Sequence, residues 1–259
     1  MHIVFVEPCF PANQKEFVRA LQGAGATVTG LGERPVEALD DDLRGWLFHY
    51  EQVPSVVDAQ VLTDRVRAIH GRLHVDRLEA TVEAHMMAAA RAREAVGIQG
   101  TSVRTTFLCR DKPAMKEVLR EAGISCAQSM GGGDRESILR FAEEVGFPLI
   151  VKPRSGAGAS GTHRANDEDA LHGILDAMGV GHGGDVAVEE FIEGHEGFYD
   201  TVSIGGEVAH EFVSHYYPNV LEAMRTRWIS PQVITTNRLD AESYGDVKNL
   251  GRKVIRDLD

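Results

Sequence analysis

The chain has 259 residues, of which 43% are hydrophobic and 25% charged, and its formal net charge is −12. These values are typical of one or two globular domains with ample core. The negative balance argues against a nucleic-acid surface, because binding of the phosphate backbone needs clustered lysines and arginines. We therefore expect no nucleic-acid partner.

Cysteine usage and hydrophobic runs indicate the expected compartment. The three cysteines, Cys9, Cys109 and Cys126, are too few and too scattered for a disulfide framework, and no CxxC pair occurs. The first strand breaks at Pro8 and has neither the basic region nor the long apolar run of a signal peptide. No stretch approaches a membrane span. The sequence predicts a cytoplasmic protein without a membrane partner.

Strand and helix signals alternate over the first hundred residues, as in a parallel sheet with helices on its faces. The expected strands are residues 3–6, 27–30 and 73–78, and the expected helices are residues 13–23, 57–70 and 81–96. The segment after the first strand lacks the glycine turn of a dinucleotide-binding domain. We predict an α/β domain over residues 1–100.

From Asp111 the order changes to helix, loop and strand. Asp111 and Asp134 are expected to cap two helices, and Gly123 and Gly146 are expected to end them. Further along, we expect a strand at residues 149–152, a helix at 167–178, a strand at 186–192, and a hairpin of residues 198–204 and 208–212.

The clearest chemical signal lies between residues 147 and 162. An apolar strand ends at Lys152 and enters a loop of small residues, which includes Ser155, Gly156, Gly158, Ser160, Gly161 and Thr162. The lysine supplies a fixed positive charge, and a loop with almost no side chains lets backbone N–H groups close over a polyphosphate. The pattern predicts a phosphate site.

The three glycines of this loop also match G-x-G-x-x-G, the signature of a dinucleotide-binding turn. That signature should lie in the first strand-to-helix turn and open a helix with an apolar face. Residues 162–166 carry no such face. A nicotinamide-dependent oxidoreductase is therefore the less favoured alternative, and it predicts a helix that begins within residues 156–161.

Three motifs follow one another in a characteristic order. They are Asp111-Lys112-Pro113-Ala114-Met115-Lys116, the strand that leads from Lys152 into the glycine loop, and Val188-Glu189-Glu190-Phe191-Ile192-Glu193-Gly194-His195-Glu196. Over roughly residues 90–259 this order resembles the nucleotide-binding half of the ATP-grasp superfamily. The resemblance implies an ATP-grasp fold of two α+β subdomains, namely a lid subdomain at residues 101–185 and an incomplete second one at 186–259.

By the same resemblance, Lys112 and Lys152 contact the phosphates of ATP, and residues 155–162 fold over the triphosphate. Backbone groups of Glu190 and Ile192, in a hinge that begins at Glu189, meet the adenine edge.

Two further site assignments concern the ribose and the substrate. Glu196 matches the carboxylate that accepts hydrogen bonds from the ribose hydroxyls, a role suited to an acceptor-only group. Arg225 and Arg227 follow the hinge, and we consider them candidates for gripping a substrate carboxylate.

The activity implied by the resemblance is that of an ATP-dependent carboxylate-amine ligase. ATP phosphorylates a carboxylate, and an amine or similar nucleophile attacks the acyl phosphate. The expected ligands are ATP, Mg²⁺ and small carboxylate and amine substrates, and a homo-oligomer is a candidate assembly. A non-catalytic nucleotide-binding module is the alternative.

The end of the chain bears on magnesium. No acidic run for magnesium is visible, and the superfamily's metal ligands would follow Asp259. An apolar helical stripe at residues 247–258 also ends without a cap. The sequence therefore predicts a truncated chain that contains no metal ligands of its own.

Overall fold

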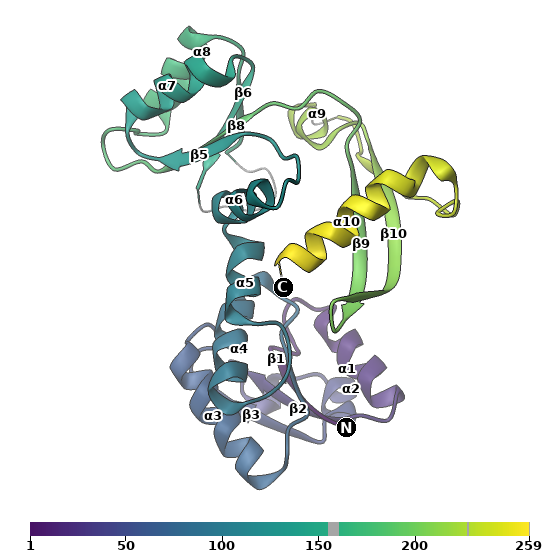
Figure 1. The fold of residues 1–259 in the computed structure, drawn as a ribbon. Coiled ribbons are helices and arrows are strands. Elements are labelled where there is room, and N and C mark those ends of the chain that lie inside the picture. Colours follow the sequence, from purple (N-terminus) through teal and green to yellow (C-terminus); the bar gives the residue numbers. More distant parts are fainter. Residues whose placement is uncertain (155–160, 227, 259) are drawn as a thin grey trace. The chain divides into compact units, whose positions relative to one another are not determined.

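The computed structural model describes residues 1–154, 161–226 and 228–258, and for Met224 and Arg225 it describes the backbone alone. These residues form two compact units, Met1–Arg110 and Asp111–Leu258 (Figure 1). Both units mix helices with strands, which confirms the predicted α/β class. None of the helices in the described ranges has the length and apolar character of a membrane-spanning segment.

The first unit is built on a parallel sheet with the strand order β3-β2-β1-β4. Its strands are β1 (His2–Val6), β2 (Thr27–Gly32), β3 (His49–Gln52) and β4 (Arg77–Glu79). Its helices are α1 (Gln14–Gly23), η1 (Val36–Ala38), α2 (Asp41–Trp46), α3 (Ala59–Arg72), α4 (Glu83–Val96) and α5 (Val103–Arg110).

Apolar clusters cover both faces of this sheet. Val4 of β1 belongs to one cluster with Leu62 of α3 and Ala89 of α4. The neighbouring Phe5 points to the opposite face and belongs to a second cluster with Val18 of α1. Every residue of β1 is buried, as expected for a parallel strand covered on both sides.

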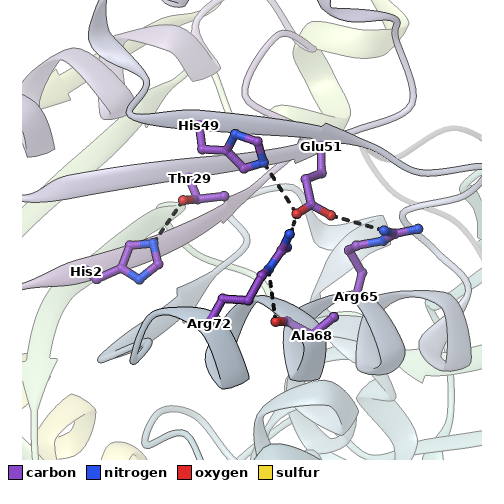
Figure 2. A network of polar contacts seen from close by, with 7 residues as sticks. All are labelled: His2, Thr29, His49, Glu51, Arg65, Ala68 and Arg72. Atoms are coloured by element: carbon purple, nitrogen blue, oxygen red, sulfur yellow. Dashed lines mark hydrogen bonds and ion pairs between the residues drawn. The ribbon is translucent and has the colours of Figure 1, made fainter.

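A polar network fastens α3 to the edge strand β3 (Figure 2). The Glu51 carboxylate accepts hydrogen bonds from Arg65, at 3.2 Å, and from Arg72, and His49 Nε2 lies 3.4 Å away. Burial on its own raises the pKa of Glu51, but the hydrogen bond from Arg72 and the charges of both arginines outweigh it, so the pKa lies below its ordinary value. The network therefore joins helix to strand through an ionised carboxylate.

The second unit contains two antiparallel sheets. The first has the order β5-β8-β6-β7, formed by β5 (Ser129–Gly132), β6 (Leu149–Pro153), β7 (His163–Ala165) and β8 (Val186–Glu190). Helices α7 (Arg135–Val145) and α8 (Glu168–Ala177) pack on one face of it (Figure 1). Ile138 of α7 and Leu171 of α8 share a core with Val151 and Val188 of the central strands.

The second sheet has the order β11-β10-β9, formed by β9 (Gly197–Ile204), β10 (Glu207–Tyr217) and β11 (Gln232–Thr235). The remaining helices are α6 (Lys112–Glu121), α9 (Val220–Arg225), η2 (Glu242–Tyr244) and α10 (Gly245–Leu258). Helix α10 runs along β9 and β10 (Figure 1). It approaches closely at Gly251, where a Cβ atom would lie 2.2 Å from the Tyr199 ring.

Two predicted helix caps are confirmed, whereas one predicted strand is wrong. Asp111 accepts a hydrogen bond from the Ala114 N–H at 3.0 Å, and Asp134 accepts one from the Ser137 N–H at 2.9 Å. The strand expected at residues 73–78 is only Arg77–Glu79. Helix α3 continues through Arg72, whose side chain binds the edge strand, so the chain can turn toward the sheet only after that residue.

Candidate functional site

Lys152 lies at the end of β6, at the entrance of the glycine loop. β6 is paired on both sides, with β7 and β8, and Lys152 stands opposite Ala187 of β8. Because the strand is central in its sheet, the backbone position of Lys152 is fixed. Four predicted loop residues lie outside the described residues, namely Ser155, Gly156, Gly158 and Ser160.

The chain leaves the glycine loop as a strand. Gly161 has a φ of +70°, and a Cβ atom there would lie 3.1 Å from Pro153, so glycine suits both its conformation and its surroundings. Thr162 then leads into β7, and the next helix starts only at Glu168. This course contradicts the helix that the nicotinamide alternative requires at the glycine loop.

The centre of the site is a carboxylate shared by two lysines. Glu189 Oε1 lies 2.7 Å from Lys152 Nζ and 3.1 Å from Lys116 Nζ. The exposed fractions of the three side chains are 14% for Glu189, 24% for Lys152 and 12% for Lys116. Burial alone raises the pKa of Glu189, but the hydrogen bond from Lys152 and the charge of Lys116 hold it below its ordinary value. The cluster therefore carries two positive charges and one negative charge.

Lys116 is the member of this cluster that sequence reasoning missed. It lies on α6, four residues after the predicted phosphate ligand Lys112, which is exposed. Residues at positions i and i+4 lie on the same side of a helix. That spacing was the signal that could have added Lys116 to the site. The structure thus brings Lys116, Lys152 and Glu189 together.

Part of the predicted hinge already makes hydrogen bonds to the backbone of a neighbouring segment. The Glu190 N–H donates to the Gln128 carbonyl at 2.9 Å, and the Glu190 carboxylate accepts from the Gln128 N–H at 3.1 Å. The strand predicted at residues 186–192 ends at Glu190. Ile192 lies just beyond it with 61% of its surface exposed.

Glu196 is placed at the first turn of α9. Its Oε2 accepts a hydrogen bond from the Val220 N–H at 2.7 Å, and its own N–H donates to Asn219 Oδ1 at 3.0 Å. The carboxylate still has acceptor capacity on Oε1. Oε1 of Glu196 is therefore open for the ribose role that the sequence predicts.

A third carboxylate cluster fastens α10 to its sheet. Glu211 of β10 accepts hydrogen bonds from the Tyr199 hydroxyl at 2.5 Å and from Arg252 at 2.9 Å, and Lys248 Nζ lies 2.9 Å away. Burial raises the pKa of Glu211, but the hydrogen bonds from the tyrosine and both cations outweigh it and lower the pKa to about 2. This cluster joins the helix to two strands.

The remaining predicted residues cannot be assigned to the site. Arg225 ends α9, but its side chain lies outside the described residues, as does all of Arg227. Within the described ranges, no three histidine, cysteine or acidic side chains form a group that could hold a metal ion.

Comparison with known proteins identifies relatives of the chain. Residues 111–197 match the family model of the carbamoyl-phosphate synthase L chain, ATP binding domain. An L-arginine-specific L-amino acid ligase from Bacillus subtilis is 28% identical over 184 residues, which are 69% of this chain and 45% of the relative. A D-alanine–D-alanine ligase from Bacillus anthracis is 29% identical over 150 residues, 56% of this chain and 45% of the relative. The aligned residues thus cover less than half the length of either relative.

Solved structures share its fold. An L-amino acid ligase from Bacillus licheniformis superposes with a TM-score of 0.72 at 18% identity, covering 99% of this chain and 60% of that one. Phosphoribosylglycinamide synthetase from Anaerococcus prevotii gives 0.71 at 15% identity, covering 99% and 61%. These likenesses confirm the fold that the three sequence motifs predict.

Proposed function

We propose that this chain is the ATP-binding portion of an ATP-dependent carboxylate-amine ligase of the ATP-grasp superfamily, a proposal supported by the matching family model, the ligase relatives and the shared fold. In that reaction the γ-phosphoryl group of ATP passes to a carboxylate oxygen with release of ADP. An amine then attacks the acyl carbon, and phosphate leaves. The names of the ligase relatives favour amino acids as substrates. A cytoplasmic location is part of the proposal and is supported by three free cysteines.

The observation that carries the proposal is the position of Lys152, where a central strand enters the glycine loop, with a second partly buried lysine on the same carboxylate. Lys116 and Lys152 supply two positive charges and Glu189 one negative, a local excess of one. At an effective dielectric constant of about 20, one lysine about 4 Å from a phosphate charge gains roughly 4 kcal/mol. This excess supports the binding of a polyphosphate anion.

The proposal assigns the adenine and ribose of ATP to other elements of the second unit. In the proposal, backbone groups of Glu190 and Ile192 meet the adenine edge, and the free Oε1 of Glu196 accepts a ribose hydroxyl. Mg²⁺ would neutralise the β and γ oxygens of ATP. A solved structure of similar fold, the biotin carboxylase domain from Hydrogenobacter thermophilus, was determined with MgADP.

Isothermal titration with ATP tests the binding site. We expect Lys152→Ala to weaken ATP binding by more than about tenfold, because a charge-assisted phosphate contact is lost. Lys15→Ala is the control, since Lys15 pairs with Asp40 on the first unit and has no place in the site. Equal ATP affinity in the wild-type protein and Lys152→Ala would refute the assignment.

Turnover distinguishes a ligase from a nucleotide-binding module. A whole ligase that contains this ATP-binding portion should release ADP from ATP only when both a carboxylate and an amine substrate are present, and a panel of free amino acids covers both roles. ATP binding that Lys152→Ala abolishes, together with no ADP release by that whole protein for any pair, would favour the non-catalytic module.

A further inference from the structure

Both lysines of the Glu189 cluster use the same carboxylate oxygen. Lys116 Nζ and Lys152 Nζ lie 3.1 Å and 2.7 Å from Glu189 Oε1. We propose that Lys116 is a positioning residue that keeps Glu189 neutralised while Lys152 moves from Glu189 to a nucleotide phosphate. This inference rests on the proposed function, because it concerns how the site accepts ATP.

The physical reason is the cost of leaving a buried charge alone. If Glu189 had Lys152 as its one partner, a phosphate could recruit that lysine only by leaving a largely buried carboxylate without a counter-charge. With Lys116 beside the same oxygen, Glu189 keeps a cation when Lys152 departs. Two ammonium groups on one oxygen also repel each other, which makes the release of either one easier.

The elements around the cluster assign different roles to the two lysines. Lys152 ends β6 at the glycine loop, so a small swing carries its ammonium group toward the phosphates. Lys116 belongs to the second turn of α6, whose start is fixed by the Asp111 cap, and it is only 12% exposed. A lysine held in this way is suited to stay with Glu189.

Titration of ATP into variants of the whole chain tests the inference. Lys116→Met should weaken ATP binding by about fivefold, an effect in the range of couplings between neighbouring charged residues. Lys116→Arg keeps the charge and should stay within about twofold of the wild type. Lys248→Met is the matched control, because Lys248 is similarly buried, at 18% exposed, and pairs with a different glutamate, Glu211. It should bind ATP as the wild type does.

The double variant Lys116→Met/Glu189→Gln separates a positioning role of Lys116 from a merely structural one. Once the carboxylate charge is gone, no charge retains Lys152, so the loss of Lys116 should no longer matter. The double variant should therefore have the same ATP affinity as the single variant Glu189→Gln. If it binds as weakly as Lys116→Met, then Lys116 contacts the nucleotide directly and the inference is overturned.

Failure of the inference is distinguishable from failure of the proposed function. Wild-type affinity in Lys116→Met, alongside a loss in Lys152→Ala, would overturn the positioning role and leave the ATP site in place. No ATP binding by the wild-type protein would remove both. Circular dichroism of each variant verifies that it is folded.

Discussion

Two carboxylates, one in each unit, are held by two cations in the same manner. Glu51 on β3 lies between two arginines of α3, and Glu189 on β8 lies between lysines of α6 and β6. The carboxylates are almost equally buried, at 11% and 14% exposed. Their partners differ, because the arginines are 46% and 63% exposed whereas the lysines are 12% and 24% exposed.

The difference shows that a carboxylate between two cations does not by itself mark a binding site. The arginines at Glu51 connect helix α3 to the strand β3, and their planar guanidinium groups are suited to a fixed contact with a carboxylate. The lysines at Glu189 are compact charges, and Lys152, at the entrance of the glycine loop, can turn from one anion to another. The location of the cluster and the type of its cations distinguish a structural ion pair from a binding site.

The largest expected effect tests this contrast on stability. Glu189→Gln should lower the free energy of unfolding by about 3 kcal/mol, because it leaves two mostly buried lysines without a counter-charge. Glu51→Gln should cost about 1 kcal/mol, since solvent screens its exposed arginines. Hydrogen exchange measured by mass spectrometry should place the first loss in Asp111–Leu258 and the second in Met1–Arg110.

Glu143→Gln is the control for both substitutions, because Glu143 is an exposed residue of α7. Its stability should stay within about 0.5 kcal/mol of the wild type. Equal losses for Glu189→Gln and Glu51→Gln would mean that the exposure of the cations does not distinguish the two clusters.

Elements with local signals are predicted from the sequence, whereas elements without them are missed. Helix α7 carries a local start signal, the Asp134 cap, and a local end signal, Gly146. The edge strand β3 (His49–Gln52) has no apolar alternation, and it is stabilised by the arginines of α3 and by its pairing with β2. Such long-range contacts leave no trace in a short window of sequence.

The same limit applies to the site. Lys152 is evident from the sequence because a strand and a glycine loop meet at it. The ion pair between Lys116 and Glu189, in contrast, joins residues 73 positions apart in the chain, from 116 to 189. The pairing of Glu196 with α9 is likewise a product of the fold. The adenine, ribose and phosphate roles of the site residues stay predictions.

A smaller effect is expected at Gly251, where α10 meets β9. A Cβ atom there would lie 2.2 Å from Cδ1 of Tyr199, whose hydroxyl is held by Glu211. Gly251→Ala should therefore lower the free energy of unfolding by about 2 kcal/mol through overpacking, although alanine has a better helix propensity than glycine. Gly173→Ala in α8 has nothing within 4 Å and should instead stabilise by about 0.5–1 kcal/mol. Thermal unfolding of both variants decides whether close packing or propensity dominates.

The smallest effect concerns Glu211, a fastening carboxylate in the same unit as Glu189. Its pKa in the folded chain is about 2, below the ordinary 4.5, so its ionised form stabilises the fold above pH 4.5 and the contribution is lost as the pH falls toward 2. Glu211→Gln should thus lower stability by about 1 kcal/mol at pH 7, after allowance for solvent screening. The gap from the wild type should narrow between pH 5 and pH 2 in urea unfolding curves followed by circular dichroism. The exposed Glu242→Gln should show neither the loss at pH 7 nor the narrowing. A gap for Glu211→Gln that stays constant with pH would mean that shape, and not charge, holds α10 on its sheet.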